Sequence, residues 1–563
     1  AGKESVAVGN GALFAQNFTT ATNSFNTAVG SNAGAAVTTG VKNTLIGGLA
    51  GDAITTASEN VAVGYDSLGT NILGQHSVAI GPSALRTQNY DTSTNAYNTA
   101  VGSFAGYAVT TGTNNTLIGG LAGTAITTGD DNVAIGYQAG DALTTGGGNV
   151  VIGHGAFSAE DTGSNHVAIG KSALAVLNIG GNSNVAIGLN SLAANVSGGN
   201  NTAIGTNTLA AQNTSGTAAD THNTAVGNSA GASVTSGISN TLIGSISGDA
   251  ITTGTNNVAM GVSSLSTDTA GQFSVAIGAN ALATQNFSTS TDVFNTAVGL
   301  SAGRLVTTGV NNTLLGGLSG DALTDADANT AIGAYSLSAD TLGSQSVAVG
   351  HGTLTHQNFT TATNSLNTAV GYVAGNGITT GILNTFIGAQ AGDAMTDADG
   401  NTAVGGQALT TDTLGLNSTA VGVTALFTQN FTTATQASNT AVGAAAGYSI
   451  TTGTKNVLMG HLTGDNMTTG SQSTFIGYEA GGAVTTGQQN DLFGALAGDA
   501  LTDADYNVAL GYATLSTDTL GSRSTAVGHS ALATQNFTTA TNTLNTAVGF
   551  YAGAAITGSA AGS

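Results

Sequence analysis

The sequence contains no cysteine, no tryptophan and one proline (Pro82), and only 6% of its 563 residues are charged. Without cysteine the chain has neither disulfides nor thiolate metal ligands. Seven Lys and Arg against 29 Asp and Glu give a formal net charge of −22, which leaves no basic patch for phosphate groups. Nucleic acid and anionic membranes are therefore not expected as partners. A membrane-spanning helix needs an apolar run of about 18 residues, and the sequence contains none, so no membrane insertion is expected.

Small residues dominate what is present. Glycine accounts for 85 residues, without the three-residue period of collagen, and the low charge does not fit a disordered chain. The composition indicates a packed, β-rich protein built from small side chains.

A short phrase of the form Thr/Val-Ala/Leu-Val/Ile-Gly recurs through the sequence, and its closing glycine serves as a marker. From Gly9 to Gly81 the steps between markers are 21, 17, 17 and 17 residues, which together make a 72-residue super-repeat. Extra short repeats fall near residues 154–205 and 495–528. The 72-residue spacing returns in markers Gly278, Gly350, Gly422 and Gly494.

Seventeen residues are too few for a strand and a helix but suit one turn, or coil, of a β-solenoid. The sequence therefore predicts an all-β fold, a parallel β-solenoid of about 31 coils, as one continuous domain over residues 1–563. The 21-residue coils carry an insertion such as TQNFTTATN, which we expect to bulge from one corner. Asn precedes most of the short strands, for example Asn26, Asn43 and Asn60, and predicts a ladder of stacked side chains.

The short strands carry apolar side chains on both faces. In Val61-Ala62-Val63 the outer two residues face one side and the middle residue faces the other. We expect the outer two to fill the coil and the middle one to face outward, where copies of the same chain would cover it, because strands apolar on both faces are buried on both. The middle residue is usually Ala, and larger ones include Leu45, Leu117, Leu242, Leu314, Phe386 and Leu458.

The phrases Ser77–Gly81 and Ser274–Gly278, both read as SVAIG, resemble the repeat of the YadA-like head of trimeric autotransporter adhesins. The NTAVG style is also similar to repeats of bacteriophage tail fibres and bacterial surface fibres. The resemblance runs from Ser5 to about Thr557 and implies a left-handed parallel β-roll, assembled as a homotrimeric rod. It also implies that the SVAIG strands, with the six large middle residues, line the trimer axis, and that the chain is extracellular, on a cell surface or in a virion tail fibre. The coils are longer than those of the adhesin head.

Aspartates recur in a fixed pattern, one at a corner and two in a following Asp-Ala-Asp triplet. Carboxylates in one coil could supply the oxygen ligands of calcium, whereas the alternative is that Asp favours turns by bonding nearby backbone. Calcium is the one metal or cofactor that the sequence suggests. The candidate ligands are Asp321, Asp325, Asp327, Asp393, Asp397, Asp399, Asp499, Asp503 and Asp505.

The residue after the marker glycine is tyrosine in five coils and histidine in four. Exposed tyrosine rings can stack on sugars, so these residues are candidate glycan contacts, with ordinary surface tyrosine as the alternative. The histidines, His154, His351, His461 and His529, are expected at an exposed corner. The tyrosines are Tyr65, Tyr137, Tyr372, Tyr478 and Tyr512.

The seven basic residues are spread singly, and no convergent set of titratable groups suggests an enzyme. The sequence therefore predicts a structural and adhesive fibre shaft, a homotrimer that attaches to a glycan or protein receptor through repeated weak contacts. A passive spacer without a ligand, an ice-binding solenoid and a calcium-binding solenoid remain alternatives. Ice binding would need Thr-x-Thr on one face, whereas pairs such as Thr38-Thr39 are adjacent and point opposite ways.

Overall fold

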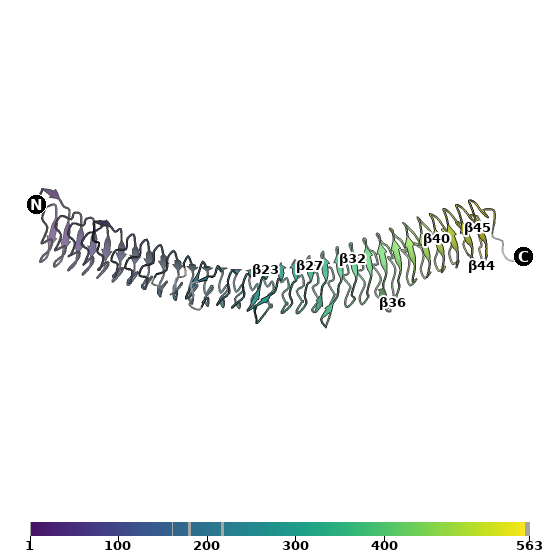
Figure 1. Cartoon of the computed structure of the whole chain (residues 1–563), viewed down its shortest axis with the longest axis horizontal. Coiled ribbons are helices and arrows are strands. Elements are labelled where there is room, and N and C mark those ends of the chain that lie inside the picture. Colours follow the sequence, from purple (N-terminus) through teal and green to yellow (C-terminus); the bar gives the residue numbers. More distant parts are fainter. Residues whose placement is uncertain (1, 160–161, 178–181, 215–218, 558–563) are drawn as a thin grey trace. The chain divides into compact units, whose positions relative to one another are not determined.

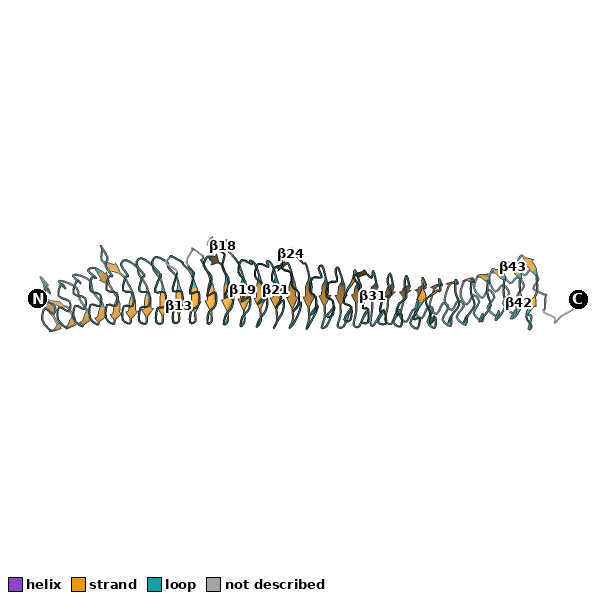
Figure 2. Cartoon of the chain, turned by 90° about the horizontal axis from the view of Figure 1, so that it is seen from below, coloured by secondary structure: helices purple, strands orange, loops and turns teal. Residues whose placement is uncertain are grey.

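The computed structural model describes residues 2–159, 162–177, 182–214 and 219–557. It is all-β, with no helix among these residues, and forms a parallel β-solenoid of about 32 turns spaced by about 17 residues. Within each of the two compact units described below, the coils stack one on the next (Figure 1) and their short strands line up on one side (Figure 2). The all-β solenoid predicted from the repeat is confirmed.

The chain divides into two compact units, the first comprising residues 1–279 and 286–292 and the second comprising residues 280–285 and 293–563. Each unit contains one long parallel sheet to which every coil contributes a three-residue strand. In the first unit the strands of this sheet are β2 (Val6–Val8), β4 (Thr27–Val29), β5 (Thr44–Ile46), β6 (Val61–Val63), β8 (Val78–Ile80), β10 (Thr99–Val101), β11 (Thr116–Ile118), β12 (Val133–Ile135), β13 (Val150–Ile152), β14 (Val167–Ile169), β15 (Val185–Ile187), β17 (Thr202–Ile204), β19 (Thr224–Val226), β20 (Thr241–Ile243), β21 (Val258–Met260) and β23 (Val275–Ile277).

The second unit repeats the arrangement with β25 (Thr296–Val298), β26 (Thr313–Leu315), β27 (Thr330–Ile332), β29 (Val347–Val349), β31 (Thr368–Val370), β32 (Thr385–Ile387), β33 (Thr402–Val404), β35 (Thr419–Val421), β37 (Thr440–Val442), β38 (Val457–Met459), β39 (Thr474–Ile476), β40 (Asp491–Phe493), β41 (Val508–Leu510), β43 (Thr525–Val527) and β45 (Thr546–Val548).

The insertion of each long coil forms a two-residue strand beside the coil before it, so a small parallel pair marks every bulge. These pairs are β1 (Gly2–Lys3) with β3 (Thr22–Asn23), β7 (Gly74–Gln75) with β9 (Thr94–Asn95), β16 (Gly198–Gly199) with β18 (Ala219–Asp220), β22 (Gly271–Gln272) with β24 (Thr291–Asp292), β28 (Gly343–Ser344) with β30 (Thr363–Asn364), β34 (Gly415–Leu416) with β36 (Thr435–Gln436), and β42 (Gly521–Ser522) with β44 (Thr541–Asn542).

The marker glycine keeps the coils in register. Gly64 has a φ of +138°, and a Cβ at this position would lie 2.6 Å from the carbonyl oxygen of Gly81 in the next coil. Any other residue would collide with backbone that cannot move without breaking the stack. The strands consequently pair residue for residue, as in Ala28 opposite Leu45.

The direction of the strand side chains is opposite to the one predicted. The middle residue points into its own coil: Leu45, Leu117, Leu242, Leu314, Phe386 and Leu458 all have an exposed fraction of 0% within the single chain. They therefore do not line an axis between copies. The first and third residues face outward instead. Strands that carry apolar side chains on both faces do not show by their pattern which face turns inward, and the thin interior of a 17-residue coil takes the smaller Ala.

The larger middle residues fill space that glycines leave open. Where the middle residue is Leu117, the corner residues beside it are Gly106 and Gly123, and a Cβ atom added to either would lie 2.6 Å or 2.8 Å, respectively, from a methyl group of Leu117. In some coils whose middle residue is Ala, such as that of Ala79, the corner carries a buried leucine, here Leu85. In others, such as the coil of Ala100, the corner is Gly106, and Leu117 of the next coil fills the space.

The predicted asparagine ladder is confirmed. Asn115 accepts a hydrogen bond from the Asn132 N–H at 3.0 Å and donates to the Gly129 carbonyl at 2.9 Å, and equivalent bonds recur in neighbouring coils. Where serine replaces asparagine, as at Ser77, a glutamine of the next coil compensates. Gln88 donates to the Ser77 hydroxyl at 2.9 Å and accepts from the side chain of Asn98 at 2.9 Å.

A buried polar layer accompanies the long coils. Asp340, fully buried, accepts hydrogen bonds from Gln357 Nε2 at 2.6 Å and from the backbone N–H groups of Gly343 and Phe359 at 3.0 Å and 3.2 Å. Burial raises the pKa of the Asp340 carboxyl, against the lowering effect of the Gln357 bond. Asp412 repeats the arrangement with Gln429. The layer ties the bulging coil to the coil before it.

Candidate interaction surfaces

The outward side of the long sheet is an apolar surface that every coil extends. Its centre consists of the first strand residue, which is Thr or Val except at Asp491, and the third, which is mostly Val or Ile and otherwise Leu, Met or Phe. Two further columns border it: the flanking column, two residues before each strand, and the corner column, directly after each marker glycine. We call the four columns together the outer sheet face. Third-position residues with an exposed fraction between 36% and 49% are Ile46, Ile80, Ile118, Ile204, Met260, Ile332, Ile387, Met459 and Leu510.

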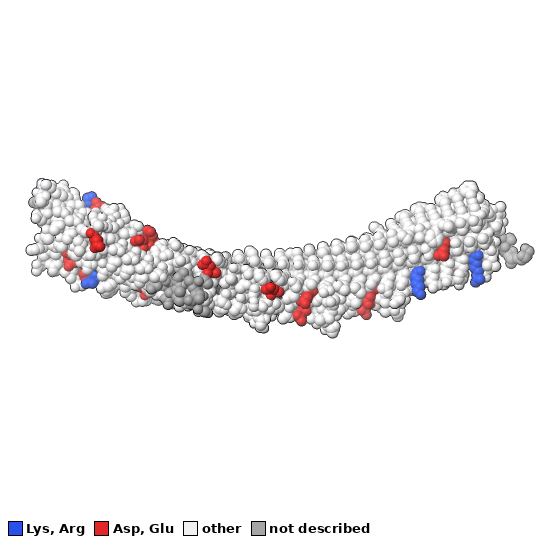
Figure 3. Space-filling model, in the orientation of Figure 1, with Lys and Arg blue, Asp and Glu red and all other residues white. Residues whose placement is uncertain are grey.

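Charge is sparse on the molecule. Figure 3 shows acidic and basic side chains scattered singly over a surface that is otherwise uncharged on the side in view. On the flanking column of the first unit, Glu59 accepts from Lys42 at 2.8 Å and lies 3.1 Å from His76. Tyr97 stacks on His76 with ring centroids 5.1 Å apart.

The corner column holds the tyrosines and histidines that the sequence singled out. All five tyrosines are exposed, with fractions from 50% for Tyr512 to 61% for Tyr65, and the four histidines are exposed as predicted. Each histidine has an aromatic neighbour in the same column. The ring pairs are Tyr137 with His154 at 5.5 Å, His351 with Tyr372 at 5.7 Å, His461 with Tyr478 at 5.8 Å and Tyr512 with His529 at 5.1 Å.

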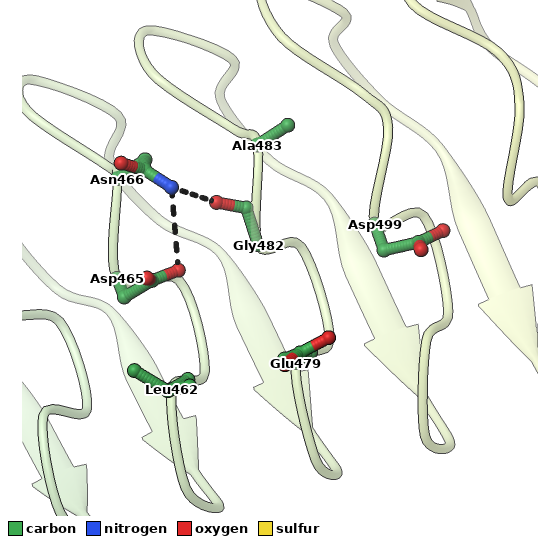
Figure 4. A pocket seen from close by; sticks show the side chains of 7 residues that line it. All are labelled: Leu462, Asp465, Asn466, Glu479, Gly482, Ala483 and Asp499. Atoms are coloured by element: carbon green, nitrogen blue, oxygen red, sulfur yellow. Dashed lines mark hydrogen bonds between the residues drawn. The ribbon is translucent and has the colours of Figure 1, made fainter.

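A shallow hollow of about 270 Å³ lies beside the pair of His461 and Tyr478 (Figure 4). Three carboxylates from successive coils line it: Asp465, Glu479 and Asp499. Burial raises the pKa of Asp465 and of Asp499, and the charge of Glu479 raises both further. Asn466 donates to the Gly482 carbonyl at 2.6 Å across the hollow. The sequence did not point to this group because each carboxylate comes from a different coil: Asp465 and Glu479 are 14 residues apart, and Glu479 and Asp499 are 20 residues apart.

No protein-family model matches the chain, and no curated protein sequence is significantly similar to it.

The aspartates proposed as calcium ligands are engaged separately. Asp325 accepts from the Thr308 hydroxyl, and Asp327 accepts from the Val310 N–H at 2.8 Å, both in the coil before. The triplets at Asp397 with Asp399 and at Asp503 with Asp505 repeat these bonds. Asp393 accepts from the Thr410 hydroxyl at 2.7 Å.

At the corner, burial raises the pKa of Asp321 and of Asp499. Within the described ranges, no group of three or more His, Asp or Glu side chains gathers closely enough to hold a metal ion. Calcium binding by these residues stays a prediction that requires the carboxylates to move together.

Two further observations concern ice binding and membrane insertion. Thr38 is half-buried and donates to the Thr55 carbonyl at 3.2 Å, whereas Thr39 is exposed, so one threonine of the pair faces out. No helix among the described residues is long and apolar enough to cross a membrane.

Proposed function

We propose that the chain is the shaft of an extracellular fibre, a structural and non-catalytic role in which copies of the chain pack their outer sheet faces together. The observation that carries the proposal is the outer sheet face itself. Its third-position column is apolar in coil after coil and its first-position column is Thr or Val in all but one strand, yet more than a third of a third-position residue such as Ile80 or Ile118 is left without cover in the single chain. A sheet that is apolar on both sides is normally covered on both sides.

The size of the surface fits a stable interface. Three strand residues span about 10 Å and each coil adds about 4.8 Å. The sixteen strands of the first unit's sheet therefore present roughly 800 Å², the area that each partner buries in an interface of standard size. The flanking and corner columns add to this area.

Three copies are the number that the resemblance to the adhesin head implies. The reversal of the side chains changes which residues meet in such a homotrimer. The contacts come from the first and third strand residues, such as Thr116 and Ile118, and the middle residues stabilise each chain by itself.

The oligomeric state in solution tests the proposal. Light scattering is expected to give a multiple of the 54.3 kDa chain, and three copies if the resemblance holds. Ile80→Lys with Ile118→Lys should dissociate the assembly, because two charges would enter an apolar contact. Ile72→Lys is the matched control, since Ile72 is similarly exposed, 40% against 37% for Ile118, but lies at a corner away from the sheet face. A monomeric wild-type chain would overturn the proposal.

Attachment to a surface glycan is a second candidate role, and the paired rings of the corner column favour it. The rings of His461 and Tyr478 are nearly parallel, at 7°, and offer an exposed apolar plane of the kind on which sugar rings stack. Weak contacts repeated along a fibre add up through avidity. Glycan-array binding that Tyr372→Ala and Tyr478→Ala abolish would support this role. Equal binding by wild type and variant would place the glycan contact outside these tyrosines, and no binding by either would favour a passive spacer.

A further inference from the structure

A fifth column of side chains, which we call the side column, lies five residues after each marker glycine and outside the outer sheet face. Packing of copies through that face therefore leaves the side column accessible. Neighbouring members are about 4.8 Å apart, because the coils are hydrogen-bonded here, as from the Ser449 N–H to the Asp465 carbonyl at 2.9 Å. Five successive coils of the second unit contribute Phe427, Tyr448, Asp465, Gly482 and Asp499 to it.

Two aromatic rings form an apolar platform in the side column. Phe427 and Tyr448 lie parallel, with an interplanar angle of 1° and ring centroids 5.0 Å apart. This separation is that of an offset stack, so part of each ring face is left uncovered by the other ring. Tyr448 has an exposed fraction of 37%, and Phe427 is half-buried. Flat apolar rings of this kind can stack on the C–H face of a sugar ring.

A glycine opens the hollow of Figure 4 two coils after the platform. Gly482 has no side chain to fill the column between Asp465 and Asp499, and a Cβ added to it would lie 3.4 Å or more from its nearest neighbours. The space is therefore open and not taken up by the side chains around it. Leu462 and Ala483 give the hollow an apolar lining beside its polar groups.

The polar groups of the hollow have acceptor capacity to spare. The Asp499 Oδ1 atom is buried and has no hydrogen-bond partner among the described residues. Asp465 Oδ1 accepts from Asn466 at 3.5 Å, which is a weak contact, and the half-buried Glu479 adds a third carboxylate. Saccharide hydroxyls are donors that such oxygens accept. None of the described residues that line the hollow is Lys or Arg, so an anionic ligand would be repelled.

We propose that the platform and the hollow together bind a neutral saccharide along the side column. One sugar ring stacks on the platform, and the hydroxyls of the following part donate to the three carboxylates of the hollow. A saccharide that carries carboxylate or sulfate groups is excluded by charge. The site lies within one chain and apart from the corner column, so it goes beyond the fibre shaft and does not depend on the packing of copies.

Two variants each remove one feature of the site. Gly482→Leu fills the hollow, and Tyr448→Ala removes the exposed ring of the platform. A printed glycan array that covers neutral and acidic saccharides identifies the glycans that the wild-type chain binds. Calorimetric titration with these glycans should show binding weakened at least about tenfold in each variant. Ala533→Leu adds the same side chain to the side column two coils beyond Asp499 and should bind like wild type. Circular dichroism checks the fold, and Tyr448→Ala carries the test alone if Gly482→Leu does not fold.

The outcomes separate this site from the other proposals. Tyr372→Ala, in the corner column, should bind like wild type, and loss of binding in that variant alone would place the contact there and overturn the inference. A wild-type chain that binds no glycan, or acidic glycans only, also overturns it, as does binding that disappears in chelator, because direct hydrogen bonds need no metal ion. Light scattering on the same samples tests the fibre shaft by itself. A monomeric chain that binds a neutral glycan through this site overturns the shaft and supports the inference.

Discussion

A methyl group of Leu117 occupies the space into which a side chain at Gly123 would grow, 2.8 Å from where its Cβ would lie. The same exchange recurs where Leu45 faces Gly51 and where Leu314 faces Gly320. The strand and corner side chains share one volume, and in these coils the leucine of the strand fills it.

This exchange predicts compensation between the two positions. Leu117→Ala should destabilise its coil by about 2–5 kcal/mol, because it leaves a cavity between two glycines. Gly123→Leu alone should destabilise by about 1–3 kcal/mol through overpacking. The double variant should recover part of the loss, since it recreates the pairing of Ala79 with Leu85 and the φ of +58° at Gly123 is close to the +46° of Leu85, whereas Ile126 Cδ1, also 2.8 Å from the added Cβ, still has to move. Hydrogen exchange of the amides in this coil measures each effect, and additive losses would contradict the prediction.

The repeat was sufficient to predict the solenoid because coil length, marker glycine and ladder asparagine are all local signals. Which side chains of a strand point into the coil was not predictable in the same way. Val61-Ala62-Val63 is apolar on both sides, and the residue that decides its orientation, Leu68 at the corner, is recognisable as a core residue only once its pairing with Ala62 is known. The polar layer of Asp340 and Gln357 was missed for a similar reason, since the two belong to different coils.

The asparagine ladder should be costly to interrupt. Asn115→Ala removes the acceptor for the buried Asn132 N–H and the donor for the Gly129 carbonyl. Each group left buried without a partner costs about 1–3 kcal/mol, so we expect a clear fall in the thermal midpoint and faster exchange at Asn132. The neighbouring Asn114→Gly is the control, because Asn114 is exposed and glycine accepts its φ of +60°. Equal effects of the two variants would show that the ladder bonds contribute little.

The buried carboxyls predict a dependence of stability on pH. Burial raises the pKa of Asp340 and of Asp412 above the ordinary value of 3.8, so the folded chain holds these protons more tightly than the unfolded chain does. Their favourable contribution is complete below pH 3.8 and is lost as the pH rises through the folded pKa. The corner aspartates such as Asp249 shift in the same direction.

We therefore expect a higher thermal midpoint at mildly acidic than at neutral pH. Asp340→Asn with Asp412→Asn should reduce this difference, and asparagine already occupies the equivalent buried position at Asn71. A midpoint that rises from about pH 4 to about pH 7 would contradict the assignment.

The last prediction concerns the effect of calcium on the thermal stability of the chain. Asp325 and Asp327 already accept hydrogen bonds from Thr308 and Val310 in the neighbouring coil, so their carboxylates stabilise the turn without a metal ion. We expect the thermal midpoint of the wild-type chain to be the same in calcium and in chelator. The Asp325→Asn, Asp327→Asn variant should also be insensitive to calcium, because an amide oxygen can replace the carboxylate as acceptor. If calcium raises the wild-type midpoint and not that of the variant, the carboxylates move together to bind it, and the calcium-binding solenoid becomes the better description of these coils.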